Sequence, residues 1–196
     1  MKEICDVYVR KFPFSIESEK IFPPLRAKEI VSCKNEKVKK EKFYVWKLLE
    51  EGLLQTLGLD IKTLLFQKEN GKWSCENCYF SLSHSGDLAA VAISTKPVGI
   101  DVEKLDTARF EKLKDDVMLT GKENYARQNA EIKNRLWTVK EAIFKRNGQG
   151  RYKPSSIETD NVKVKTEVFF VEEQGYILSV ACDVTPRFIK EKEVRI

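Results

Sequence analysis

Two segments with helical periodicity, residues 36–57 and 131–146, constrain the fold of this chain more than any other feature. Each segment runs into a glycine, Gly58 or Gly148, and glycine is the residue that most readily ends a helix. In the first segment apolar side chains recur at three-to-four spacing, which commits one helix face to packing. That stripe consists of Trp46, Leu49, Leu53, Leu54 and Leu57. We therefore expect two long packed helices.

Short β patterns surround both helices. Residues 4–12 indicate an opening strand and residues 25–31 a short helix, and the spacing of Thr120 and Glu123 is that of a capping box at a helix start. Further strands are expected at residues 63–66, 79–83, 88–93 and 98–103, and again at 157, 162–164, 167–171, 176–182 and 187–194, with turns at Asn70-Gly71 and Gly86-Asp87. The order strand, helix, strands thus occurs twice, which predicts an α+β fold of two similar halves, residues 1–97 and 98–196.

Composition narrows the class of protein only in part. The chain has 196 residues, 42% of them hydrophobic, which is enough for one sizeable core or two small ones that share an interface. A net charge of +5 suits a polyanionic cofactor, an acidic protein partner or nucleic acid. No apolar run approaches the ~20 residues that a bilayer requires. With no signal-peptide pattern and an odd number of cysteines, we expect a cytoplasmic protein with reduced thiols.

The C-x-x-C formed by Cys75 and Cys78 is half of a zinc-site pattern. The chain offers no second pair at a suitable spacing, and His84 is its only histidine. Structural zinc is therefore not expected.

Two acids lie two residues apart in a predicted strand. Side chains at alternate positions of a strand face the same side, so Asp101 and Glu103 would present their carboxylates together while Ile100 and Val102 pack behind them. Paired hard oxygen ligands suit a magnesium ion. Taken alone, however, this stretch favours two solvated acids on an edge strand.

The second helix adds another acid and a base. Trp137, Glu141 and Lys145 recur at intervals of four beside the apolar stripe of that helix. An exposed ion pair is the simpler interpretation of Glu141 and Lys145, but a helix carboxylate that faces two strand carboxylates forms an oxygen cage for magnesium. Ser83 and His84 precede a glycine turn whose free N–H groups can hold a phosphate, which by itself is a weak signal.

Four motifs, in this order along the chain, resemble the 4'-phosphopantetheinyl transferase superfamily in its Sfp-type branch. The most specific are G-I-D-V-E and W-x-x-K-E-A-x-x-K taken together. The chain departs from the family pattern at Trp73, where proline is common, and at residues 116–119. The matching residues are Gly71-Lys72, Ser83-His84-Ser85, Gly99-Ile100-Asp101-Val102-Glu103 and Trp137-Thr138-Val139-Lys140-Glu141-Ala142 with Lys145.

The resemblance implies the fold of that superfamily, a pseudo-dimer of two α+β halves in one chain, working as a monomer with one site at the seam. It implies an enzyme with holo-[acyl-carrier-protein] synthase activity. Such an enzyme transfers 4'-phosphopantetheine from coenzyme A to a serine of an acyl or peptidyl carrier protein and releases 3',5'-ADP. The expected setting is fatty acid, polyketide or nonribosomal peptide biosynthesis, with residues 107–134 on the carrier-binding side.

The resemblance also implies roles for single residues. Asp101, Glu103 and Glu141 would hold Mg²⁺, and Lys145 would stabilise charge while the serine hydroxyl attacks the β-phosphate. Glu141 would act as the general base, directly or through a metal-bound water. The coenzyme A contacts are expected from Ser83, His84, Gly71 and Lys72, with Lys28 and Lys42 at the 3'-phosphate.

Two other functions fit part of the sequence. In a nuclease-like Mg²⁺-dependent enzyme Asp101 and Glu103 would serve equally well, but the motif from Trp137 to Lys145 would have no explanation. A basic nucleic-acid-binding module would use the lysine-rich residues 34–42, but the chain lacks the paired aromatics of an RNA-binding sheet. We therefore expect a carrier protein and coenzyme A as partners, with no nucleic acid and no membrane.

Overall fold

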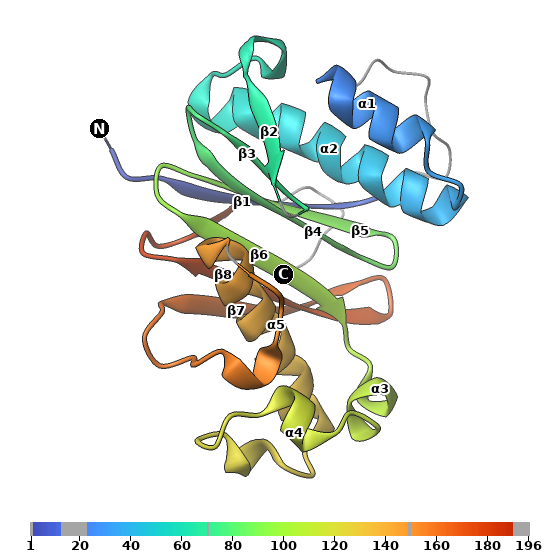
Figure 1. Ribbon diagram of the computed structural model, residues 1–196, viewed down its shortest axis with the longest axis vertical. Helices are drawn as coiled ribbons and strands as arrows, with labels where there is room; N and C mark the ends of the chain where they lie inside the picture. Colours follow the sequence, from blue (N-terminus) through green and yellow to red (C-terminus); the bar gives the residue numbers. More distant parts are fainter. Residues whose placement is uncertain (1, 13–22, 70, 149, 190–196) are drawn as a thin grey trace.

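The computed structural model describes residues 2–12, 23–69, 71–148 and 150–189, and it has a mixed α+β architecture (Figure 1). The fold class predicted from the sequence is thereby confirmed at the level of α+β. In chain order the elements are β1 (Cys5–Lys11), α1 (Pro24–Val31), α2 (Glu36–Leu57), η1 (Ile61–Thr63), β2 (Phe66–Glu69), β3 (Lys72–Cys75), β4 (Tyr79–Ser85), β5 (Leu88–Ser94), β6 (Val98–Lys104), α3 (Thr107–Glu111), α4 (Asp115–Met118), η2 (Asn124–Ala126), α5 (Ala130–Asn147), η3 (Pro154–Ser156), β7 (Val164–Val171), β8 (Gln174–Cys182) and β9 (Arg187–Ile189).

The two larger sheets share one strand arrangement. One sheet has the order β4-β5-β1-β9 and the other β6-β8-β7, while β2 and β3 form a separate hairpin. In the first sheet β1, which precedes α2, pairs antiparallel with β5, the second strand of the β4–β5 hairpin. In the second sheet β6, which precedes α5, pairs antiparallel with β8, the second strand of the β7–β8 hairpin. The repeated element order read from the sequence therefore has a counterpart in the strand pairing.

Both long helices end where the sequence predicts. The side chain of Asn35 accepts a hydrogen bond from the Val38 amide at the start of α2, and Asn129 does the same for Ile132 at the start of α5. Gly58 ends α2 with φ +67° and Gly148 ends α5 with φ +72°. A side chain with a Cβ is strained in that left-handed region, so glycine lets each helix stop sharply.

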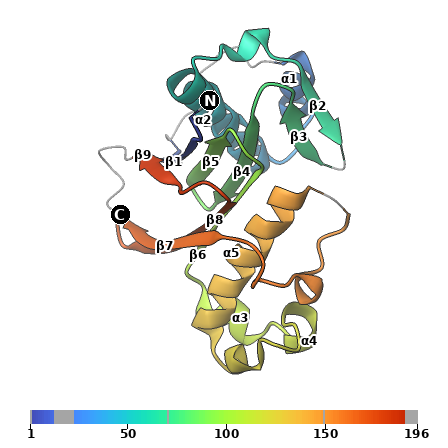
Figure 2. The same ribbon diagram turned by 90° about the vertical axis from the view of Figure 1, so that its left-hand side faces the viewer.

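The core consists of layers. Helix α2 packs on one face of the β1–β5 sheet and α5 lies against the β6–β8 sheet on the other side of the molecule (Figures 1 and 2). Apolar side chains from both sheets fill the space between them. Ile100 and Val102 belong to this inner cluster, so alternation turns Asp101 and Glu103 toward α5, as the sequence predicts.

Some predicted elements were wrong. Of residues 63–66, which were predicted as a strand, only Phe66 lies in one, because η1 and a loop precede β2. Strand β3 was not predicted. No α-helix begins at Thr120: its amide does donate to Glu123 Oε2 at 2.8 Å, but Glu123 is also held by the ammonium of Lys140, and a single 3-10 turn follows.

At the C-terminal end, Ile157 follows the turn η3 and belongs to no strand, and β7 begins only at Val164. Asn70 and residues 190–194, which were predicted as part of a turn and a strand, lie outside the described residues. Within the described segments, no helix combines the length and the apolar character needed to cross a membrane.

Candidate functional site

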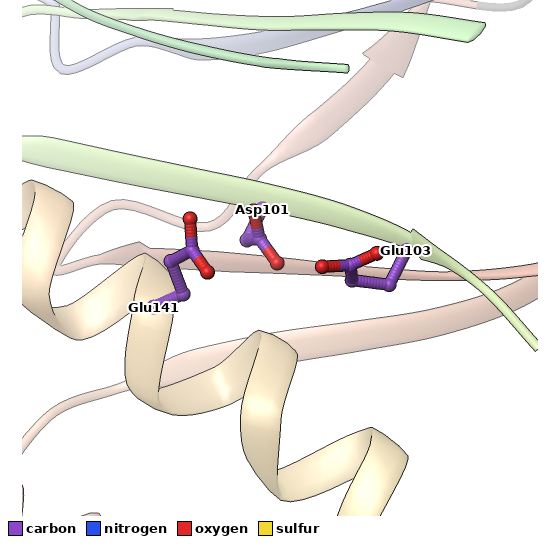
Figure 3. Close-up of side chains that lie close together, drawn as sticks. All are labelled: Asp101, Glu103 and Glu141. Atoms are coloured by element: carbon purple, nitrogen blue, oxygen red, sulfur yellow. The ribbon is translucent and has the colours of Figure 1, made fainter. Parts of the chain in front are cut away.

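Three carboxylates meet between β6 and α5. Asp101 and Glu103 come from β6 and Glu141 from α5, and one oxygen of each lies within 4.8 Å of the others. Figure 3 shows the three side chains facing one another, with Asp101 in the middle. The strand alternation and the helix position on which the sequence argument relied thus bring these three acids together.

Gly99 allows this close approach of strand and helix. A Cβ at that position would lie 1.9 Å from the carbonyl oxygen of Ala142 and 2.4 Å from the amide nitrogen of Arg146. The backbones of β6 and α5 are therefore in direct contact, with no side chain between them. This contact sets the distance from Asp101 to Glu141.

Serine side chains join β4 to β6 along the seam between the two large sheets. Alternate serines on β4 accept hydrogen bonds from alternate amides of β6. The pairs are Ser81 with Ile100 at 3.0 Å, Ser83 with Val102 at 3.2 Å and Ser85 with Lys104 at 3.1 Å. Ser83 also donates to Asp101 Oδ1 at 2.8 Å, and Ser85 donates to Glu103 Oε2 at 3.2 Å. The seam thereby orients both acids of β6.

Lys145 bridges the carboxylates. Its Nζ lies 2.8 Å from Asp101 Oδ1 and 3.2 Å from Glu141 Oε1, and it donates to Ser83 Oγ at 3.2 Å. Burial would lower the pKa of Lys145, but the two carboxylates raise it above its ordinary value. Burial raises the pKa of Asp101 to about 7, although the Lys145 ammonium opposes that shift. The negative charges of Glu141 and Glu103 raise the pKa of Asp101 further.

The carboxylate cluster fits a divalent cation. Asp101 is 2% exposed, and its Oδ2 is buried without a hydrogen-bond partner among the described residues. An unpaired buried carboxylate oxygen is costly in a folded protein unless a cation or water completes it. Magnesium prefers carboxylate oxygens at about 2.0–2.1 Å and retains positions for water and phosphate. The donor set therefore matches Mg²⁺.

A cavity of about 290 Å³ lies beside Lys145; we refer to it as the Lys145 cavity. Gly71 and Lys72, two of the residues predicted to contact coenzyme A, line it, and the Lys72 ammonium donates to the carbonyl oxygen of Lys145. The described residues that line it are Gly71, Lys72, Trp73, Phe80, Ser81, Leu82, Phe144, Lys145, Gly148 and Gly150.

The remaining predicted contacts lie elsewhere. His84 is on the opposite face of β4 from Ser83, with Nδ1 3.6 Å from Glu41 Oε2, and burial lowers its pKa. Lys28 is exposed on α1. Lys42 on α2 pairs with Glu29 at 2.8 Å. None of these three lines the Lys145 cavity, and the hydroxyl of Ser83 is already engaged by Asp101 and β6.

Tyr152 belongs to the site but was not found from the sequence. Trp137, Glu141 and Phe144 share one face of α5, and the Tyr152 ring lies 5.4 Å from the Trp137 ring and 5.2 Å from that of Phe144. It therefore covers the helix turn that carries Glu141. Its hydroxyl is buried without a partner among the described residues, and burial followed by the charge of Glu141 raises its pKa. A lone tyrosine in a loop gave no signal.

Arg109 is a second residue that the sequence did not reveal. Its Nη1 lies 3.3 Å from Glu103 Oε1, and its guanidinium lies 5.1 Å from the centre of the Trp137 ring. Arg109 therefore closes the end of the carboxylate cluster opposite to Lys145. A single arginine in helix α3 carries no pattern that would indicate this role.

The fold and the site together define an α+β protein with a three-carboxylate cluster between β6 and α5 that could hold a metal ion. Residues 97–191, the segment that contains all three acids and Lys145, match the family model of the 4'-phosphopantetheinyl transferase superfamily. This match confirms the resemblance that the sequence motifs show.

Curated relatives carry the same description. The chain is 31% identical over 133 residues to the 4'-phosphopantetheinyl transferase gsp of Aneurinibacillus migulanus, covering 62% of this chain and 54% of that protein. It is 32% identical over 112 residues to psf-1 of Bacillus pumilus, covering 53% and 48%, and 27% identical over 128 residues to a 4'-phosphopantetheinyl transferase of Bacillus subtilis, covering 61% and 56%. The matches thus span about half the length of these relatives.

Proposed function

We propose that this protein is a 4'-phosphopantetheinyl transferase. It moves the phosphopantetheine arm of coenzyme A onto a serine of an acyl or peptidyl carrier protein and releases 3',5'-ADP. The observation that carries the proposal is the three-carboxylate cluster with Lys145, which lies within the segment matched to the superfamily. The relatives that resemble the chain are named for the same activity.

Asp101, Glu103 and Glu141 are the residues that would hold Mg²⁺. The unpaired Oδ2 of buried Asp101 supports this assignment, and the hydrogen bonds from Ser83 and Ser85 keep both strand acids oriented. When bound, Mg²⁺ neutralises charge on the pyrophosphate of coenzyme A and acts as a Lewis acid.

Lys145 and Glu141 would carry out the remaining chemistry. The serine oxygen of the carrier attacks the β-phosphorus of coenzyme A. The bond between that phosphorus and the oxygen of the departing 3',5'-ADP breaks. Glu141 takes the serine proton, directly or through a water molecule. The Lys145 ammonium, which lies between Asp101 and Glu141, stabilises the negative charge that develops on the phosphoryl oxygens.

Coenzyme A would occupy the Lys145 cavity and the surface next to it. Gly71 and Lys72 form part of that cavity, which supports their assignment to the nucleotide. We place His84 at the phosphates, and Lys28 and Lys42 at the 3'-phosphate. Because Lys42 is paired with Glu29, a phosphate would compete with that carboxylate. We also place Ser83 at the phosphates. Its hydroxyl is hydrogen-bonded to Asp101 and Lys145, the residues proposed to act on the phosphoryl group.

The carrier protein would dock on the segment between β6 and α5. Val117 is 48% exposed and Tyr125 is 64% exposed in this segment, and exposed apolar side chains of this kind serve as contacts at protein interfaces. The net charge of +5 favours the encounter with an acidic carrier. We propose that nucleic acid is not a partner of this protein.

We further propose that the chain is a pseudo-dimer of two halves, residues 1–97 and 98–196, that works as a monomer. The shared strand pairing of the two large sheets supports two related halves, and a site at their seam needs no second copy. The five cysteines are free thiols. A reducing compartment keeps thiols in this state, and on that ground we propose the cytoplasm.

Intact-mass spectrometry of apo carrier proteins incubated with enzyme, coenzyme A and Mg²⁺ tests the proposal. We expect the gain of one phosphopantetheine with the wild type and with the control Glu173→Ala, which changes an exposed acid far along the chain from the site. Asp101→Ala and Lys145→Ala should abolish the gain. If the folded wild type neither modifies any carrier nor binds coenzyme A in calorimetry, the proposal is wrong.

A further inference from the structure

Two cysteine thiols face each other where β3 passes into β4. Cys75 is the last residue of β3 and Cys78 immediately precedes β4. Their sulfur atoms lie 3.3 Å apart. A disulfide bond is about 2.05 Å long, so a shift of about 1.3 Å would bring the two sulfurs to bonding distance. Cys75 is half-buried and Cys78 is 8% exposed.

The two thiols differ in acidity. The hydrogen bond with Cys78 lowers the pKa of Cys75 to about 7, against the effect of burial, and the backbone amides of Asn77 and Cys78 add to the lowering. The hydrogen bond with Cys75 and burial raise the pKa of Cys78. Because the thiolate is the reactive form of cysteine, Cys75 has the properties of an attacking group and Cys78 those of a resolving thiol.

Access distinguishes this pair from the other cysteines. Cys75 and Cys78 line a cavity of about 450 Å³, which we call the cysteine cavity. Cys5 and Cys182 also neighbour each other but are 2% and 3% exposed in the core. A reagent in solution can therefore reach Cys75 without unfolding of the protein, whereas the core pair is shielded.

The cysteine cavity favours a small anionic reagent. Lys72 and Arg146 line it, and Glu69 is the only acid among the described residues of its lining. Glutathione disulfide, a flexible disulfide that carries net negative charge, has the matching chemistry.

We propose that Cys75 and Cys78 are a redox-active dithiol, a modification site at which low-molecular-weight disulfides introduce an internal disulfide. The thiolate of Cys75 attacks one sulfur of the reagent and expels one thiol. Cys78 then loses its proton, attacks the sulfur of Cys75 and expels the second thiol. The protein loses two electrons and two protons, and the reagent disulfide is reduced to two thiols. This inference does not depend on the proposed transferase activity.

The internal disulfide would constrain residues that line both the cysteine cavity and the Lys145 cavity. Lys72, Trp73, Phe80 and Gly148 line the cysteine cavity and the Lys145 cavity alike. Lys72 begins β3, the strand that Cys75 ends, and its ammonium contacts the backbone of α5. Oxidation therefore fixes the bend that connects the strands carrying Lys72 and Phe80.

Thiol trapping tests the proposal. The reduced protein is incubated with mixtures of glutathione and glutathione disulfide, quenched with N-ethylmaleimide under denaturing conditions and analysed by peptide mass spectrometry. We expect Cys75 and Cys78 to become protected from alkylation together, as one peptide lighter by two hydrogen atoms. Cys5 and Cys182 should stay alkylated at every ratio, and excess dithiothreitol should reverse the change.

Single variants identify the order of the two steps. Cys78→Ser keeps the attacking thiolate but lacks the resolving thiol, so it should accumulate a mixed disulfide with glutathione on Cys75. Cys75→Ser should take up at least tenfold less glutathione, and Cys33→Ser, a control outside the pair, should oxidise like the wild type. The proposal is overturned if both thiols stay alkylatable in glutathione disulfide, if the core pair oxidises first, or if the purified protein holds one equivalent of zinc on these thiols.

Discussion

Replacing Gly99 by alanine tests whether direct backbone contact between β6 and α5 sets the carboxylate site. The added Cβ would lie 1.9 Å from the carbonyl oxygen of Ala142, whereas ordinary contacts begin near 3.4 Å. The difference is 1.5 Å, and the neighbouring atoms belong to helix backbone, which cannot rotate away as a side chain can. Strand and helix must therefore separate, or one of them must bend.

We expect Gly99→Ala to lower both the stability of the protein and its affinity for Mg²⁺. Overpacking of this kind costs about 1–3 kcal/mol or more, and for a chain of this size 1 kcal/mol corresponds to roughly 2–4 °C in Tm. We expect Gly99→Ala to lower the Tm by about 6–12 °C, taking the upper end because the clash is with backbone. Magnesium–oxygen distances near 2.1 Å tolerate no shift of that size, so Mg²⁺ affinity should fall at least tenfold.

Gly121→Ala is the matched control. Apart from its two chain neighbours, no described residue has an atom within 4 Å of a Cβ built at Gly121, so this variant should melt at the wild-type temperature or slightly above it. Melting is followed by circular dichroism, and metal affinity by calorimetry below the Tm of each variant. If Gly99→Ala melts with the wild type and binds Mg²⁺ equally well, the backbone contact does not set the site and the reasoning is refuted.

Three further predictions concern polar side chains that are buried or half-buried. Lys140→Met should lower the free energy of unfolding in urea by about 3–5 kcal/mol, because it leaves the 3% exposed Glu123 without its cation. The double variant with Glu123→Leu should recover most of that loss. Ser83→Ala should lower the free energy of unfolding by about 1–3 kcal/mol, since the buried amide of Val102 loses its acceptor. An unchanged midpoint of urea unfolding would show that this hydrogen bond between β4 and β6 does not stabilise the protein. Burial would raise the pKa of Glu29, but surrounding cations lower it from 4.5 to about 2. Its stabilisation is therefore complete above pH 4.5 and is lost toward pH 2, a loss that Glu29→Gln should not show in acid titrations of stability.

The local parts of the fold could be predicted from the sequence because their causes are local. Gly58 and Gly148 end the long helices at the predicted places, since the left-handed conformation at each helix end favours glycine whatever surrounds it. Asp101 and Glu103 share a strand face by alternation. Trp137, Glu141 and Lys145 share a helix face by their spacing. None of these placements depends on a partner far away in the chain.

Other predictions were wrong where a distant partner intervened. Thr120 and Glu123 have the spacing of a capping box, and half of that box forms, but the carboxylate of Glu123 also meets Lys140 Nζ at 2.5 Å. That ammonium is fully buried and contacts two carbonyl oxygens as well. A buried ion pair outweighs the weak local preference for a helix start, and the sequence has no signal for it.

Local patterns in the sequence were enough to predict which residues share a face and where the helices end, because periodicity and helix capping act within a few residues. They were also enough to show the motifs that resemble the superfamily. How those faces meet depends on contacts that form only in the folded chain. Gly99 brings α5 against β6, and the serines of β4 orient the acids of β6 across the seam. These contacts join segments that are far apart in the chain, and such contacts depend on packing and desolvation that no local pattern encodes.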